Sequence, residues 1–220
     1  MNRRQLLVGS GATLSAVLAG CASDTAETGN GSGNGQSELN DGKGPLEAHG
    51  WMGTGSLHKN FVSIGSGLTV IDATYEGDDF LVHLYQVEGE DSYRLETASE
   101  YDGASATLLD GGDYTLAVNG NGAQWSVEIR HPRADHGESP HTIFDDGPVV
   151  AGPFEFDDSE VARISHPHPS TFAATIYPTD GDSGEQLSTN LNGDSEVQFD
   201  FDGVGWVDVR AANPWEISFE

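Results

Sequence analysis

The sequence of 220 residues is poor in thiols and in basic side chains. It contains one cysteine, so the chain has no second thiol with which to form an internal disulfide. Lys and Arg together number 9 against 36 Asp and Glu, which gives a formal net charge of −27. Nucleic-acid binding relies on clustered Lys and Arg side chains, so this balance excludes nucleic acid as an expected partner.

The sequence also lacks the short motifs that mark common catalytic sites. It has no Gly-x-Ser-x-Gly, His-Glu-x-x-His or Gly-x-x-x-x-Gly-Lys pattern. Asp and Glu are so widespread that no carboxylate pair stands out as an acid and a base. We therefore expect a protein that is not an enzyme. A hydrolase site assembled between two modules is the enzymatic alternative.

The N-terminus has the pattern of an export signal. Arg3 and Arg4 stand before an apolar run from Leu6 to about Ala19, which is shorter than the roughly 20 residues that a membrane-spanning helix needs. The stretch Arg3–Leu7 resembles the twin-arginine signals, whose translocon exports folded proteins. We expect residues 1–20 to be a signal peptide that is removed after export.

The single cysteine, Cys21, stands directly after Leu18-Ala19-Gly20. An aliphatic residue, two small residues and a cysteine resemble the lipobox of exported lipoproteins. The resemblance implies that the signal is cut before Cys21, that its sulfur carries lipid, and that the protein is held on the extracellular face of the cell membrane. Each methylene buried in the bilayer would contribute about 0.8 kcal/mol. The alternative is an incidental thiol in a peptide that is discarded.

The acidic residues are spread along the chain after the signal rather than gathered in a tail. Such a surface repels itself, and salt near 1 M screens that repulsion to within about 3 Å. The spread therefore indicates adaptation to salt. Together with the export signal, it resembles the surface lipoproteins of salt-loving archaea.

Residues 21–45 are rich in Gly, Ser, Asn and acidic side chains and almost free of apolar ones. A stretch of this composition cannot bury a core, so we expect a flexible acidic tether. We expect the rest of the chain to divide into two repeats, over 46–132 and 151–220, with a linker over 133–150.

This division depends on an internal repeat. The segment Phe80–Tyr85, FLVHLY, matches Phe172–Tyr177, FAATIY, at an offset of 92, and Trp125–Ile129 matches Trp215–Phe219 at an offset of 90. Between them, offset 92 places Tyr114 on Trp206. The alternation of apolar side chains instead favours an alignment of Tyr114, Leu116 and Val118 with Val207, Val209 and Ala211. Because strand side chains alternate between faces, we expect a bulge or a small insertion here.

Each repeat has the pattern of short β-strands with turns between them. In the first repeat, strands are expected near 61–64, 67–72, 80–87, 92–97, 104–109, 113–119 and 124–130. No window shows a helical period. About seven strands in each repeat favour an all-β fold of two tandem β-sandwiches of Greek-key or jelly-roll type.

Alternation and repetition also indicate which side chains are buried. His83 and Thr175 are expected to face outward, and the cores to include Phe80, Val82, Leu84, Phe172, Ala174 and Ile176. Trp125 and Trp215 recur at equivalent places, which favours core packing over a surface that stacks on sugars. Trp51 and Trp206 lack such a counterpart, and Trp51 would be a surface contact or would cover the open end of the first repeat.

The stretch Gly112–Ile129, GDYTLAVNGNGAQWSVEI, resembles the final hairpin of the pre-peptidase C-terminal type domain. In that family a Gly-x-aromatic strand is followed by a turn and by a second strand with an aromatic residue at its start. The resemblance implies an accessory, non-catalytic extracellular module, although this sequence contains no attached protease. We therefore expect a binding or structural role at the cell surface. The expected partners are membrane lipid and an unidentified extracellular ligand or surface protein.

The histidines suggest the main alternative, a metal- or ligand-binding surface protein. His131, His136 and His141 follow one another at five-residue steps between acidic side chains, and His166 and His168 stand two residues apart. Imidazole and carboxylate groups suit zinc or copper, so a divalent metal is the candidate cofactor. The polar side chains of a solvated linker explain the same pattern without a metal.

A calcium loop is a further metal alternative. Asp180, Asp182 and Glu185 lie in a stretch that begins like a Ca²⁺ loop, but its twelfth position is Leu191 rather than a bidentate Glu. Acidic turns of this kind are also typical of a salt-adapted surface.

Overall fold

The computed structural model describes residues 46–97, 100–157, 160–167, 172–179, 181, 183–189 and 193–220. Every regular element in this part of the chain is a β-strand, which confirms the predicted all-β fold class. The signal, Cys21 and the tether predicted over 21–45 lie outside the described residues, as do His168, Asp180 and Asp182. No helix among the described residues is long and apolar enough to cross a membrane.

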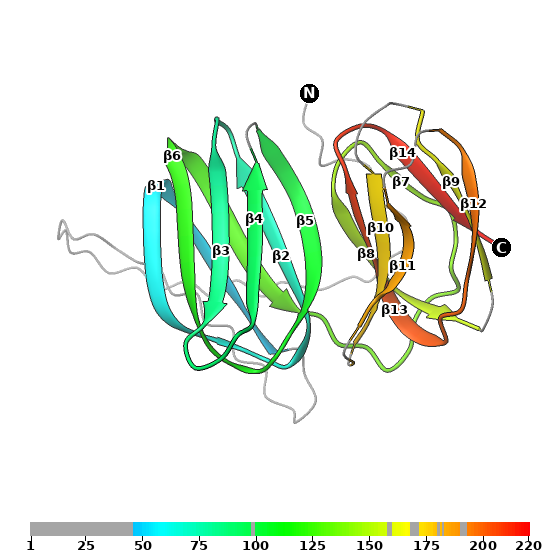
Figure 1. The fold of residues 1–220 in the computed structure, drawn as a ribbon, viewed down its shortest axis with the longest axis horizontal. Coiled ribbons are helices and arrows are strands. Elements are labelled where there is room, and N and C mark those ends of the chain that lie inside the picture. The colour runs from blue at the N-terminus through cyan, green and yellow to red at the C-terminus, as the bar shows by residue number, and fades with distance from the viewer. Residues whose placement is uncertain are drawn as a thin grey trace, which may run out of the picture. The chain divides into compact units, whose positions relative to one another are not determined.

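The first sandwich is built from six strands (Figure 1): β1 Leu46–Ile64, β2 Gly67–Tyr75, β3 Phe80–Gln86, β4 Ser92–Thr97, β5 Tyr101–Leu109 and β6 Gly112–His131. The first half of β6 pairs with β3 and its second half pairs with β2, while β1 pairs with both halves. The two long strands therefore pass from one sheet of the sandwich to the other. The sheets run in the orders β4-β3-β6-β1 and β5-β2-β6-β1.

The predicted hairpin between 113–119 and 124–130 is wrong, because both stretches belong to the one strand β6. Asn119 already lies between Leu81 of β3 and Ser56 of β1, so neither edge is left for the other half of β6. Asn121 and Gly122 both have positive φ, 43° and 89°, and form the bend between the sheets. The sequence Asn-Gly favours a hairpin turn locally, but pairing with β1 along both halves overrides that preference.

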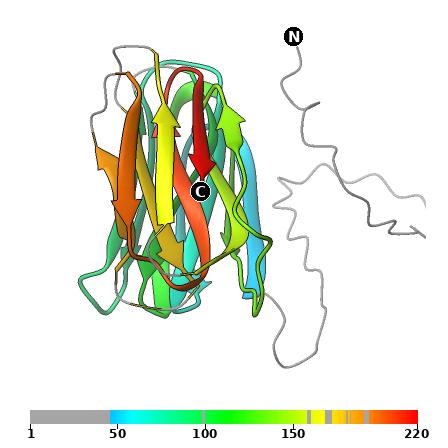
Figure 2. The ribbon, with the colours of Figure 1, turned by 90° about the vertical axis from the view of Figure 1, so that its right-hand side faces the viewer.

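The second sandwich repeats this topology with shorter strands: β7 Ile143–Asp145, β8 Val149–Phe156, β9 Glu160–Ser165, β10 Phe172–Pro178, β11 Glu185–Thr189, β12 Ser195–Phe199, β13 Gly203–Ala211 and β14 Trp215–Phe219. Its sheets run β11-β10-β13-β8 and β12-β9-β14-β7, and Figure 2 shows the latter four strands side by side. The pairs β7/β8 and β13/β14 take the places of β1 and β6. Each pair is interrupted where its long counterpart bends.

The strand ladders fix the alignment that the sequence left uncertain. Leu84 pairs with Leu116 in the first sandwich, and its counterpart Ile176 pairs with Val207 in the second. Val207 therefore corresponds to Leu116, and Tyr114 corresponds to Gly205. The predicted alignment of Tyr114 with Val207 was wrong by two residues. A shift of two residues keeps every side chain on its face of the sheet, so the alternation of apolar side chains cannot detect it.

Each sandwich has its own apolar core. The six side chains predicted to lie there from β3 and β10 are fully buried, which confirms that prediction. Trp125 and Trp215 are buried as well, and their indole N–H groups donate to the carbonyl oxygens of Gly55 and Gly147 at 2.9 and 2.8 Å. Both glycines lie where the first strand of the sandwich changes sheet, so each indole ties that corner to the core. Trp51 packs against the first core and covers part of it.

Candidate functional site

The linker histidines do not come together. His131 ends β6 and is buried, with its Nδ1 3.4 Å from the Thr69 hydroxyl oxygen. Burial, together with Arg133 and His49 nearby, lowers the pKa of His131 to about 4, so the ring is held neutral. A buried neutral imidazole at this place is a packing residue of the first sandwich.

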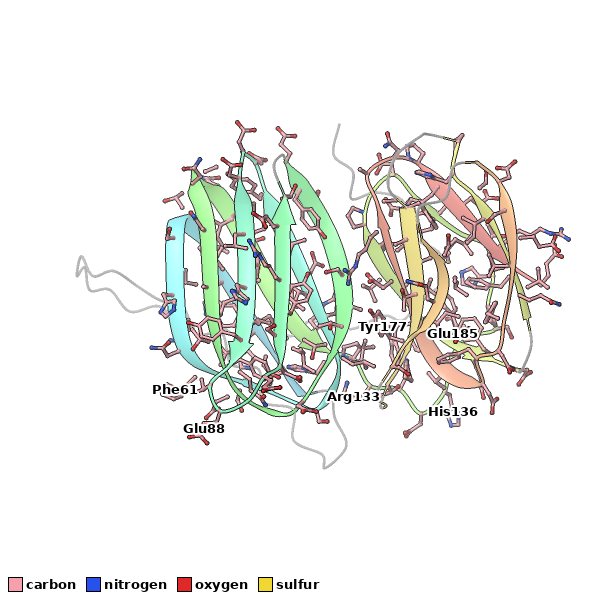
Figure 3. The ribbon with its side chains drawn as sticks, viewed as in Figure 1. Phe61, Glu88, Arg133, His136, Tyr177 and Glu185 are labelled. Atoms are coloured by element: carbon pink, nitrogen blue, oxygen red, sulfur yellow. The ribbon has the colours of Figure 1, made fainter. Side chains whose placement is uncertain are left out.

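His136 and His141 are exposed on the segment between the sandwiches, and Figure 3 labels the first of them. The ring of His141 packs edge-on against Phe154, with the centroids 5.2 Å apart. Across the described ranges, no three His, Cys, Asp or Glu side chains lie close enough to hold a metal ion. Solvent contact and local packing thus account for both residues.

His166 has a place in the second core. In the first sandwich Val127 pairs with Ala73, and in the second Ile217 pairs with Ile164. Ile164 therefore corresponds to Ala73, and His166, two residues further along, corresponds to Tyr75. Both side chains are buried. The His166 ring lies 5.1 Å from the Phe172 ring, and the main-chain carbonyl oxygen of His166 accepts a hydrogen bond from the Gly193 N–H. The other member of the His-x-His pattern, His168, lies outside the described residues.

The most unusual polar group is one that the sequence did not single out. Asp208 and Arg210 lie on β13, and the Asp208 side chain is almost completely buried, with 3% of its surface exposed, while that of Arg210 is half exposed. The Ala106 N–H donates to Asp208 Oδ1 at 3.1 Å, and Arg210 Nη2 donates to the Ala106 carbonyl oxygen at 2.8 Å. Arg210 Nε also donates to Asp208 Oδ2 at 2.9 Å. We call these three residues the clamp.

The clamp pairs both main-chain groups of Ala106, a buried residue in the edge strand of its sheet. The strand β5 is the last in its sheet, so alternate N–H and C=O groups point away from β2 without a strand partner. Asp208 and Arg210 supply an acceptor and a donor to Ala106, as a neighbouring strand would. Two residues earlier, the Ala104 N–H donates to the Pro148 carbonyl oxygen at 3.3 Å. The second repeat therefore covers the edge of the first.

Apolar side chains surround the clamp. Leu68, Val70, Ala104 and Ala106 point outward from β2 and β5, and Trp206 of β13 is buried with them in a third apolar cluster. The Leu68 N–H donates to the Thr179 carbonyl oxygen at 3.1 Å. The described residues consequently belong to one compact unit rather than two.

The clamp lies in a poorly solvated environment. Burial raises the pKa of Asp208 to about 6, against the opposing effects of Arg210 and of the Ala106 N–H. Burial also raises the pKa of the phenols of Tyr93 and Tyr177, which flank the clamp. The Tyr93 hydroxyl is hydrogen-bonded to Ser105 of β5. Of the two Asp208 oxygens, Oδ1 thus accepts from the first sandwich, while Oδ2 accepts from Arg210 on the same strand.

Arg133, labelled in Figure 3, makes several hydrogen bonds at the start of the linker. Its Nη1 donates to the carbonyl oxygens of Leu68 and Pro132 at 2.9 and 2.8 Å, and its Nη2 donates to that of Ser66. Hydrogen bonds from a guanidinium to several carbonyls fix the chain direction where it leaves β6. The linker therefore starts from an anchored point.

Two outward sheet faces carry the remaining polar groups of interest. On β4-β3-β6-β1, His58 Nε2 lies 3.0 Å from the Tyr85 hydroxyl oxygen, and the His83 ring lies 5.2 Å from the Tyr85 ring. We call this the histidine face. On β12-β9-β14, an open depression of about 500 Å³ is lined by Arg163, Ile164, Ser165, Asp194, Ser195, Glu196, Glu216, Ser218 and Glu220, and we call it the acidic face. In it, Arg163 pairs with Glu196 at 3.2 Å and with Glu220 at 2.7 Å.

Comparison with known proteins adds little to this description. No protein family matches the chain, and no curated protein matches it. Among solved structures, a single-residue variant of oxalate decarboxylase from Bacillus subtilis aligns with a TM-score of 0.19 and 8% sequence identity, over 79% of this chain and 74% of that one. A likeness at this TM-score bears on neither the fold nor the function of this protein.

One feature of the sequence indicates the clamp, although weakly. In the corrected alignment, Asp208 and Arg210 take the places of Ala117 and Asn119 of the first repeat. Two charges that appear in only one repeat, between and beside the buried Val207 and Val209, indicate a specific polar contact. The partners of these two side chains are the main-chain N–H and carbonyl oxygen of Ala106, and a contact with main-chain atoms cannot be recognised from a sequence.

Proposed function

We propose that the protein is a non-enzymatic, lipid-anchored structural module of the cell surface, in which two β-sandwiches act as one rigid body. The observation that carries this proposal is the clamp on Ala106, reinforced by the apolar cluster around it. In this arrangement the main-chain N–H and carbonyl of the buried Ala106 are both paired, and an arrangement that kept Ala106 buried without the clamp would leave them unpaired.

The polar chemistry of the described residues supports a structural role. His131 and His166 are packing residues, and Asp208 and Arg210 are paired with each other and with the β5 edge. A flexible pair of modules would instead be joined by a polar, poorly packed contact. The module would hold its outer faces in a fixed relation at a distance from the membrane.

The anchor part of the proposal is supported by the sequence. Arg3 and Arg4 precede an apolar run, and Leu18-Ala19-Gly20 stands before Cys21, the chain's single thiol. The acidic stretch over 21–45 would then act as a spacer between lipid and folded module. Extracellular placement agrees with the lack of other cysteines.

Cell fractionation tests the anchor. In a salt-loving archaeal host, the wild-type protein should sediment with membranes, dissolve in detergent, and have a mature N-terminus at a lipid-modified Cys21 by mass spectrometry. The variant Cys21→Ser should move almost entirely to the soluble or culture fraction, while Ser23→Ala, just beyond the lipobox, should behave as wild type. An intact Met1 in the mature protein, or membrane association of Cys21→Ser, would contradict the anchor.

A further inference from the structure

The two sandwiches meet through unlike faces, which leaves one face of each kind open. The second sandwich contributes the outward side of β11-β10-β13-β8, with Tyr177, Trp206 and Asp208. The first sandwich contributes the outward side of β2 and β5, with Leu68, Val70 and Ala106. A contact between unlike faces of equivalent modules does not close on itself, so the same mode can be used again between copies.

The open faces are the counterparts of the faces in contact. In the first sandwich, Ala117 pairs with His83, as Asp208 pairs with Thr175 in the second. The histidine face therefore corresponds to the face that carries the clamp. In the second sandwich, Arg163 pairs with Glu196, as Asp72 pairs with Ala104 in the first. The acidic face therefore corresponds to the face that receives the clamp.

The two open faces also differ in charge, because the histidine face carries much less negative charge than the acidic face. On the histidine face, side chains that pair across the strands form two outward rows. One row consists of Ser56, Asn119, Leu81 and Glu96, and the other consists of His58, Ala117, His83 and Arg94. The one acid of these eight residues, Glu96, is paired with Arg94 at 2.7 Å. The acidic face has four carboxylates and one guanidinium.

The residues on the open faces are more polar than those in the internal contact. The position of Trp206 is occupied by Thr115 on the histidine face, and that of Ala104 by Glu196 on the acidic face. Burial of large apolar side chains dominates a permanent contact. An association between open faces would therefore be weaker than the internal one and reversible.

We propose that the histidine face of one copy docks on the acidic face of a second copy, head to tail. This inference supplies the partner for the structural role proposed above, and it does not depend on the lipid anchor. Copies with a net charge of −27 repel each other at a distance. Salt near 1 M limits that repulsion to about 3 Å, while ion pairs in direct contact remain, so association should strengthen as salt is added.

Analytical ultracentrifugation of the full chain tests the inference. The chain carries Cys21→Ser throughout, so that neither lipid nor a disulfide can join copies. We expect the weight-average mass to stay near the 23.3 kDa of one chain at about 0.2 M KCl and to rise to at least twice that value at about 2 M KCl and high protein concentration. A single-chain mass at every salt and protein concentration would overturn the proposal.

Charge variants on each face distinguish head-to-tail docking from other modes. His83→Glu on the histidine face and Glu216→Lys on the acidic face should each reduce association at least tenfold. Met52→Glu adds the same charge at an exposed site off both faces and should leave association unchanged. Circular dichroism melting curves that match the parent chain would show that the variants are folded.

Mixing the two variants provides the decisive result. Each retains the face that the other has lost, so an equimolar mixture should form a 1:1 dimer that grows no further. A mixture that remains monomeric, or Glu216→Lys chains that associate as strongly as the parent, would show that the two faces do not meet and would overturn the proposal. Neither result bears on membrane anchoring, because every chain in the experiment lacks the thiol.

Discussion

At the scale of single residues, a few polar side chains are buried and contribute to the packing of this protein. The indoles of Trp125 and Trp215 each bury a large ring and donate one hydrogen bond to a carbonyl at a sheet corner. His131 and His166 are also buried, although their spacing in the sequence had made them candidate metal ligands of the alternative function. A spacing pattern reports the order of residues along the chain, whereas burial depends on the face to which each residue belongs.

Replacement of Trp215 should separate the contributions of its ring and its N–H group. Trp215→Ala should lower the free energy of unfolding by about 3–5 kcal/mol, because it leaves a large cavity. Trp215→Phe should lower it less, by about 1–3 kcal/mol, since much of the ring volume remains and the bond to the Gly147 carbonyl is lost. Denaturant unfolding followed by circular dichroism measures both, and equal losses would contradict the assigned hydrogen bond.

His131 should make the protein sensitive to acid. Its pKa is about 4 in the folded state and near 6.5 in the unfolded state, so between these values the unfolded chain binds a proton that the folded chain does not. The free energy of unfolding should therefore fall as the pH drops from about 6.5 to about 4, on the order of 2 kcal/mol after allowance for solvent screening. The raised pKa of Asp208 acts in the opposite direction between about pH 4 and 6.

The variant His131→Gln isolates this contribution, because it keeps Asp208 and removes the titrating ring. Its stability relative to wild type should improve steadily as the pH falls from 7 to 4.5. The matched variant His136→Gln, at an exposed linker position, should follow the wild-type curve. A constant difference between His131→Gln and wild type over this range would show that the histidine does not titrate as described.

At the scale of elements, the long strands β1 and β6 define the first sandwich by belonging to both of its sheets. Their second-repeat counterparts are broken at the same corners, into β7/β8 and β13/β14. The corner of β6 is tightly packed. A Cβ atom added at Gly120 would lie 2.4 Å from Cδ1 of Trp125. Glycine at 120 therefore allows the bend and the buried indole to coexist.

The substitution Gly120→Ala should be destabilising by about 1–3 kcal/mol, because the added methyl overlaps the Trp125 ring and forces the corner to shift. Gly50→Ala, in the same sandwich but with no heavy atom near the added methyl, should change stability by less than about 0.5 kcal/mol. Thermal unfolding of the two variants side by side makes this comparison. Equal stability of both would mean that the corner is loosely packed.

The sequence predicted the elements better than their connections. Period-two alternation located β3, β10 and their buried side chains, and the repeat revealed the shared topology. It failed at Asn121-Gly122, where a local preference for a hairpin lost to pairing with β1 over both halves of β6. The presence of Asp208 and Arg210 in one repeat alone indicates a polar contact, but the sequence could not identify the partner, which is the backbone of Ala106. Contacts with main-chain atoms depend on tertiary structure alone.

At the scale of the whole molecule, we propose that the two sandwiches move as one rigid body. Separate cores would allow separate motion, but the clamp and the cluster around Trp206 join them. Breaking the clamp would leave the Ala106 N–H and carbonyl without protein partners at the β5 edge. Unpaired buried groups of this kind cost about 1–3 kcal/mol each. The arrangement should then loosen even though each sandwich keeps its fold.

The lone cysteine makes this claim directly measurable. With Cys21→Ser, new thiols at the exposed positions Met52 and Glu216 allow one spin label on each sandwich. The double variant Asp208→Ala with Arg210→Ala removes the clamp. Arg94→Ala with Glu96→Ala removes an exposed ion pair of the same type on the first sandwich alone, and serves as the matched control.

Electron paramagnetic resonance distance measurement between these two labels tests the account most directly. The parent chain and the Arg94/Glu96 control should give one narrow distance distribution, and loss of the clamp should broaden or displace it while circular dichroism shows both sandwiches folded. A broad distribution in the parent chain, or one that is unchanged when the clamp is removed, would show that the clamp does not hold the two sandwiches as one rigid body.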